Sequence, residues 1–166
     1  NLVQIPRLRV LGWVLVVVLV AAHNRAVFGQ SGPWVLPFAG LLAAYCLLSW
    51  ILLRQFYEPL LPFSLGAVFL HLDLVLLVFA IYVSGGERSL LFFLPLIRVA
   101  DQVSTTFRRV RMFAHLGVLY YVLLILYLIH GEGRPVVGAV EVAKILSLYA
   151  CGLYIASTAL TAERLR

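Results

Sequence analysis

The sequence has few charged residues, few cysteines and almost no alternation of polar and apolar positions. Only 12% of its 166 residues are charged and 63% are hydrophobic, whereas about a quarter of the residues in soluble globular domains are charged. The apolar residues form long blocks that lack the period-2 or period-3.6 alternation of elements facing water. The pattern excludes an ordinary soluble domain and predicts a chain whose solvent is lipid.

Several familiar chemistries are also missing. The two cysteines, Cys46 and Cys151, lie inside apolar segments, so they predict neither a disulfide framework nor a metal site. The sequence contains no phosphate-binding loop, no dinucleotide-binding glycine motif, no HExxH and no GxSxG, and its four histidines are scattered. We therefore expect no catalytic machinery in this region. The net charge of +6 does not indicate nucleic-acid binding, because the basic residues sit at the ends of apolar segments.

Six apolar segments are present, and a helix needs about 20 residues to span the hydrocarbon core. Short polar turns join them, which predicts an all-α protein with six transmembrane helices in an antiparallel bundle. The predicted spans cover residues 10–22 (extending to 28), 34–53, 62–83, 89–105, 112–130 and 135–160. Pro95, Arg98 and Asp101 interrupt the fourth span.

The distribution of arginine predicts the orientation of the chain. With the N-terminus inside, eight arginines fall on the cytoplasmic side and three on the other, which favours cytoplasmic positions for both termini. The eight are Arg7, Arg9, Arg54, Arg108, Arg109, Arg111, Arg164 and Arg166, and the three are Arg25, Arg88 and Arg134.

Ionisable residues inside the spans are the main functional candidates, since charge is costly in hydrocarbon and is retained there for a reason. The predicted buried charged network consists of His71, Asp73, Arg98, Asp101, Glu141 and Lys144. Within it, the i,i+3 spacing places each of two opposite-charge pairs on one helix face. These pairs are Arg98 with Asp101 and Glu141 with Lys144.

Asp73 and Arg98 are expected at the same depth in the membrane. Asp73 lies 13 residues before Gly86, taken as the centre of the hairpin, and Arg98 lies 12 residues after it. Equal rise along two antiparallel helices would bring the two side chains together. Lys144, ten residues beyond Arg134, is a second candidate partner for Asp73. Such a pair could fix helix packing only, or it could belong to a ligand-linked or proton-linked site.

The hairpin from His71 to Ile97 reads HLDLVLLVFAIYVSGGERSLLFFLPLI. Its order of features is an acidic residue in an apolar helix, two glycines, a serine, two aromatic residues and Leu-Pro. This stretch resembles the membrane sensor domains of bacterial histidine kinases of the RegB/PrrB redox-responsive type, whose six-helix topology the whole chain shares. Related anchors precede diguanylate cyclases. The sequence departs from that family at Leu90, where proline is preferred, and at Arg98 and Asp101, where small apolar residues are usual.

The resemblance implies a multi-pass input domain in the bacterial cytoplasmic membrane, working as a homodimer with an output domain on the same chain. It further implies a quinone as a possible ligand near the glycine turn, and the alternative is a tight interhelical turn that needs glycine for its geometry alone. The candidate ligand-binding residues are Asp73, Gly85, Gly86, Ser89, Phe92, Phe93 and Arg98.

The last residues of the sequence suggest how a signal could leave the membrane. Residues 1–160 are predicted to form the sensor domain, and residues 161–166 begin a cytoplasmic helical stalk, because no Gly or Pro stops the sixth helix. The alternative for these last residues is a frayed, positively charged cytoplasmic end. The stalk would lead to a histidine kinase or nucleotide cyclase domain. Two other functions stay open: a small transporter or channel subunit whose buried charges form a pathway, and a structural subunit of a membrane complex. The sequence shows no internal repeat of the kind common in transporters.

Overall fold

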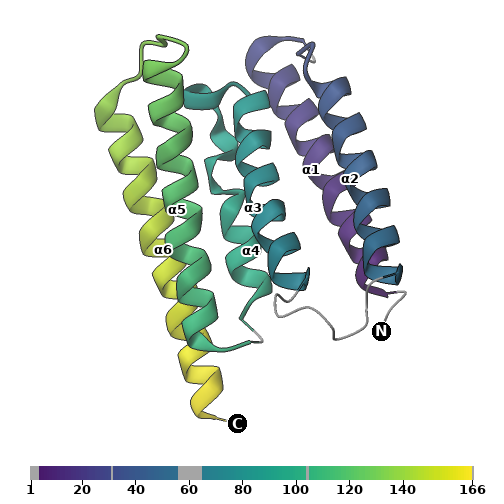
Figure 1. Ribbon diagram of the computed structural model, residues 1–166. Helices are drawn as coiled ribbons and strands as arrows, with labels where there is room; N and C mark the ends of the chain where they lie inside the picture. The colour runs from purple at the N-terminus through teal and green to yellow at the C-terminus, as the bar shows by residue number, and fades with distance from the viewer. Residues whose placement is uncertain (1–3, 31, 56–64, 104, 166) are drawn as a thin grey trace. The chain divides into compact units, whose positions relative to one another are not determined.

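The computed structural model describes residues 4–30, 32–55, 65–103 and 105–165 (Figure 1). These residues form helices and no strand, which confirms the all-α prediction. The α-helices are α1 (Gln4–Phe28), α2 (Val35–Gln55), α3 (Leu65–Val83), α4 (Pro95–Asp101), α5 (Phe107–His130) and α6 (Gly138–Arg164). Two short 3₁₀ helices, η1 (Gly86–Arg88) and η2 (Leu90–Phe93), lie between α3 and α4.

Four of the described helices are long and apolar enough to cross a membrane. Only 22–33% of the residues in their most apolar stretches are buried, although these stretches consist mainly of apolar side chains. Helices that are apolar all round and expose most of that surface are typical of a lipid environment. The four stretches are Arg9–Phe28, Val35–Leu52, Phe107–His130 and Gly138–Arg164, and α3 adds the shorter apolar stretch Val68–Val83.

The fourth predicted span is not one continuous helix. Its first part is η2, in which Leu91 departs from helical geometry with φ −85° and ψ 17°, and α4 begins only at Pro95. Proline has no backbone N–H to donate, so it starts a helix well but cannot continue one. At seven residues, α4 is far shorter than the roughly 20 residues that a span needs. The prediction of a single helix over 89–105 is therefore corrected.

Other helix ends also differ from the predicted ones. The helix α1 begins at Gln4 and α5 at Phe107, both earlier than the apolar runs indicate. The helix α6 continues without a break to Arg164, so no change of structure marks the predicted boundary between residues 160 and 161. The predicted start of the third span, at Pro62, lies outside the described residues.

The chain divides into two compact units, residues 1–73 and 74–166. In the first unit, α1 and α2 lie side by side as an antiparallel hairpin (Figure 1). In the second unit, α5 and α6 form another hairpin, packed closely through small residues. A Cβ added to Gly152 would lie 3.0 Å from the Cβ of Ala114, and Ala156 is buried. Small residues allow this close approach, which is a common way for helices to associate in lipid.

Candidate functional site

The turn after α3 needs its two glycines for geometry and for packing. Gly85 has φ 108° and Gly86 has φ 64°, in the left-handed region that favours glycine. A Cβ on Gly86 would stand 2.8 Å from Cδ1 of Leu128 in α5 and 3.2 Å from Nη1 of Arg134. The close approach that Gly86 permits is thus made by side chains of the same chain, which accounts for this glycine without a ligand.

Ser84 and Ser89 form a fully buried hydroxyl pair across this turn. Ser84 Oγ donates to the carbonyl oxygen of Ile81 over 3.0 Å and lies 2.6 Å from Ser89 Oγ. Because a hydroxyl carries one proton, Ser89 is the donor of the shared bond. Ser89 Oγ also accepts from the backbone N–H of Leu91 over 3.1 Å, at the start of η2. The predicted ligand-binding hydroxyl therefore already holds the turn in place.

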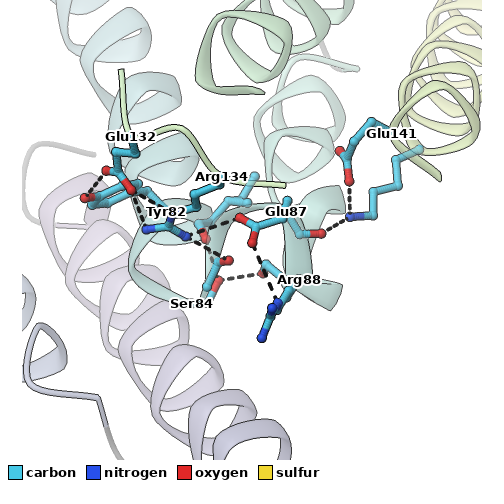
Figure 2. A network of polar contacts seen from close by, with 11 residues as sticks. Tyr82, Ser84, Glu87, Arg88, Glu132, Arg134 and Glu141 are labelled. Atoms are coloured by element: carbon cyan, nitrogen blue, oxygen red, sulfur yellow. Dashed lines mark hydrogen bonds and ion pairs between the residues drawn. The ribbon is translucent and has the colours of Figure 1, made fainter. Parts of the chain in front are cut away.

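Arg134, in the loop between α5 and α6, forms hydrogen bonds with several polar groups around the turn (Figure 2). Its Nε donates to Glu132 Oε2 over 2.7 Å, and its Nη1 donates to Glu87 Oε2 over 3.2 Å. The same Nη1 lies 3.4 Å from the carbonyl oxygen of Gly85. The guanidinium carbon is 5.7 Å from the ring centre of Tyr82, whose hydroxyl donates to Glu132 Oε1 over 2.7 Å. One arginine thus ties the end of α3 to the α5–α6 loop.

Lys144 extends the network into α6. Its Nζ donates to the backbone carbonyl of Glu87 over 2.5 Å and to Glu141 Oε1 over 2.8 Å. The other oxygen of Glu141 accepts from the Tyr121 hydroxyl over 2.6 Å. Glu141 and Tyr121 are buried, so these bonds compensate for the removal of the carboxylate from water. The i,i+3 spacing predicts the Glu141–Lys144 pair, and the ion pair is present.

The charges of this network balance. Three carboxylates face three cations, so the site needs no counter-ion. The carboxylates belong to Glu87, Glu132 and Glu141, and the cations to Arg88, Arg134 and Lys144. The hydrogen bond from Tyr82 lowers the pKa of the Glu132 carboxyl below its ordinary value; desolvation opposes the shift and Arg134 reinforces it. Glu132 therefore stays ionised at neutral pH and keeps the loop bound to the turn.

The remaining predicted residues of the second unit lie close to this network or on α4. Phe92 lies under Lys144, with Nζ 6.0 Å from its ring centre, and its own ring is 6.2 Å from that of Phe93. Arg98 and Asp101 form the expected i,i+3 ion pair, with Nη1 and Oδ2 2.5 Å apart. In this pair the Arg98 side chain is 18% exposed and that of Asp101 is 46% exposed.

A second charged cluster occupies the first unit. Asp73 is fully buried, and its Oδ2 lies 3.0 Å from Nη2 of Arg9. Its Oδ1 accepts from the Tyr45 hydroxyl over 2.7 Å. The Arg9 guanidinium lies 5.8 Å from the ring centre of Tyr45 and 5.4 Å from that of Phe69, within the range of cation–π attraction. Asp73 therefore has a cation and a hydroxyl donor from α1 and α2.

The predicted pair of Asp73 with Arg98 stays a prediction, since the two residues belong to different units. Each has an ion-pair partner in its own unit, Arg9 and Asp101 respectively. His71, two residues before Asp73, is half-buried.

Several residues of both clusters escape sequence analysis. The sequence indicates Arg9 and Arg134 only as topology signals and does not single out Glu87, although each forms a specific ion pair. One signal was available for the loop residues. The six-span topology predicted from the sequence puts Glu87 and Arg134 in loops on the same side, and opposite charges in neighbouring loops can pair. Nothing in the sequence singles out Tyr45 or Tyr121.

The described contacts of both clusters are hydrogen bonds and ion pairs that hold charged side chains in place. Among the described residues, no group of three or more His, Cys, Asp or Glu side chains could hold a metal ion. Comparison with protein-family models, with curated proteins and with solved structures finds no match. The function therefore has to be argued from these two clusters and from the helices that carry them.

Proposed function

We propose that this chain is the membrane-embedded input domain of a bacterial signal-transduction protein, of the sensor histidine kinase kind. The observation that carries the proposal is the contact of Lys144 with the α3 turn. Lys144 lies on α6 and donates to the backbone oxygen of Glu87 in η1. A change in the turn therefore acts directly on α6, the helix that reaches the last described residues.

The coupling requires only a ligand that prefers one position of the turn. A ligand shifts a conformational equilibrium by its difference in affinity for the two states, and a few kcal/mol is enough. The polar groups of the turn are bonded to one another, so a small displacement of Arg134 or Lys144 breaks specific hydrogen bonds. Networks of this kind have discrete arrangements and do not deform continuously.

A quinone is the ligand we propose, on the resemblance of the hairpin to redox-responsive sensors. Lys144 uses two of its three ammonium protons on described acceptors, Glu87 O and Glu141 Oε1. The Phe92 ring lies 6.0 Å from Nζ. A quinone carbonyl could accept the third proton, with its ring against Phe92. Ser89, in contrast, already uses its only hydroxyl proton on Ser84.

The experiment uses the cysteine that α6 already carries. Cys151 is exposed on α6, and in a Cys46→Ser background it accepts one spin label per chain. With the protein in nanodiscs, we expect the label-to-label distance between the two chains of a dimer to shift when a short-chain quinone analogue is added. We expect Lys144→Gln to abolish the shift. Binding of the analogue without any shift would contradict the coupling, and the absence of an interchain distance would contradict the dimer.

We also propose six membrane passes with both termini in the cytoplasm, from the eight-to-three arginine distribution. Reporter fusions at Tyr57, Arg109 and Arg166 are expected to report cytoplasm. Fusions at Ser31, Glu87 and Gly133 are expected to report the opposite side. Because α4 is short, a fusion at Arg109 on the wrong side would show that the segment between α3 and α5 does not cross the membrane.

A further inference from the structure

An apolar groove runs between the first half of α1 and the second half of α2. Its volume is about 490 Å³, within the range of roughly 300–1,000 Å³ typical of ligand sites. Much of its wall is exposed apolar surface, including Val14 at 57% and Leu47 at 60%. Residues that form the wall include Arg9, Val10, Val14, Cys46, Leu47 and Trp50. Both helices are long and apolar enough to span a membrane, so in a bilayer the apolar groove would take an acyl chain in preference to water.

Arg9 gives the groove a polar end. Its side chain is only 13% exposed, and the ion pair with Asp73 uses Nη2. Among the residues that the structure describes, no other hydrogen-bond acceptor reaches the guanidinium, so donors on Nη1 and Nε are available. The site therefore combines an apolar channel with a cationic donor at one end, which is the arrangement that an amphiphile with a negatively charged head requires.

The charge of the hairpin identifies the kind of head group. Residues 4–55 contain no Asp or Glu. Arg7 and Arg9 lie near the start of α1, and Arg54 lies near the end of α2, so three of the hairpin's four arginines share the end where the groove begins. Asp73 on α3 neutralises one of them. Basic residues beside a membrane helix attract anionic lipid heads.

We propose that this groove binds an anionic phospholipid, with one acyl chain along Val14 and Leu47 and the phosphate accepting hydrogen bonds from Arg9. Guanidinium N–H groups are strong donors to phosphate oxygens. The lipid would fill the space between α1 and α2 and leave the Arg9–Asp73 ion pair intact. This inference does not depend on the proposed signalling role.

The test measures which lipid the purified chain retains. Native mass spectrometry of the protein in detergent, with equal amounts of phosphatidylglycerol and phosphatidylcholine of identical chains, gives the ratio of the two bound lipids. We expect a preference for phosphatidylglycerol of roughly fivefold, the factor expected for one basic residue near the head group. A ratio near one would overturn the proposal.

Substitutions in the wall of the groove and at its polar end locate the site. Val14→Trp fills the groove. Val18 lies one turn further along α1, is equally exposed at 56% and is not part of the wall, so Val18→Trp is the matched control. We expect only Val14→Trp to reduce lipid binding severalfold. We expect Arg9→Met/Asp73→Asn, which removes the guanidinium donors without stranding the Asp73 carboxylate, to bring the lipid ratio close to one. Equal effects of the two tryptophans, an unchanged ratio in Arg9→Met/Asp73→Asn, or a dimer that only Val14→Trp dissociates would overturn the proposal.

Discussion

Arg9→Gln is expected to lower the free energy of unfolding in detergent by roughly 3–5 kcal/mol, because it removes the guanidinium that pairs with a buried carboxylate. Asp73 is fully buried, and the Arg9 side chain is only 13% exposed. The hydroxyl of Tyr45 still donates to Asp73 in the variant, which favours the lower end of this range. The measurement is equilibrium unfolding of the purified protein, followed by circular dichroism.

The double variant Arg9→Gln/Asp73→Asn separates the ion pair from packing. Removing both charges leaves no stranded ion, so we expect it to be more stable than Arg9→Gln alone. Arg25→Gln is the matched control, since Arg25 lies on the same helix and is exposed. We expect it to change stability by less than about 0.5 kcal/mol. A double variant as unstable as the sum of the two single ones would show that Arg9 and Asp73 do not interact.

A second double-mutant cycle tests the predicted pair of Asp73 and Arg98. Their matched distance from Gly86 remains the argument for it. A coupling energy above about 0.5 kcal/mol between Asp73→Asn and Arg98→Gln would support the pair, and additive losses would refute it. Asp101→Asn serves as the comparison, because Arg98 has its described partner there.

The long helices could be predicted from the sequence because of a single physical constraint. Lipid offers no hydrogen bonds to the backbone, so long apolar runs have to be helical. The same constraint does not show whether an apolar run is one helix. Between Ser89 and Thr105, apolarity indicates a span, but Pro95 and the non-helical Leu91 divide it into η2 and α4. Local backbone geometry decides this, and hydropathy does not report it.

The polar contacts also differ in whether the sequence predicts them. The Glu141–Lys144 and Arg98–Asp101 pairs follow from the helical repeat alone, so spacing in the sequence is enough to find them. The bond of Lys144 to the Glu87 carbonyl joins residues 57 positions apart and involves a backbone group. No side-chain pattern encodes an acceptor of that kind. Long-range contacts through the main chain become visible only once the helices are placed.

Lys144→Met is also expected to lower the free energy of unfolding in detergent, by at most roughly 3–5 kcal/mol. It strands Glu141, which is buried, and it leaves the Glu87 carbonyl without its donor. Tyr121 continues to donate to Glu141, which limits the loss. The matched control is Arg88→Gln. Arg88 is 70% exposed and its Nε lies 3.7 Å from Glu87, and exposed ion pairs of this kind contribute about 0–1 kcal/mol.

The double variant Lys144→Met/Glu141→Gln distinguishes a packing role from a signalling role. With both charges removed, no ion is stranded, and we expect stability to recover relative to Lys144→Met. The contact between α6 and the turn is still missing, because methionine cannot donate to the Glu87 carbonyl. Methionine also cannot donate to the quinone carbonyl, so the analogue is added at a concentration that saturates the weakened site. If α6 transmits the state of the turn, this stable variant should then show no shift between labels on Cys151. A stable double variant that keeps the full shift would assign Lys144 to packing alone and refute the proposed route through α6.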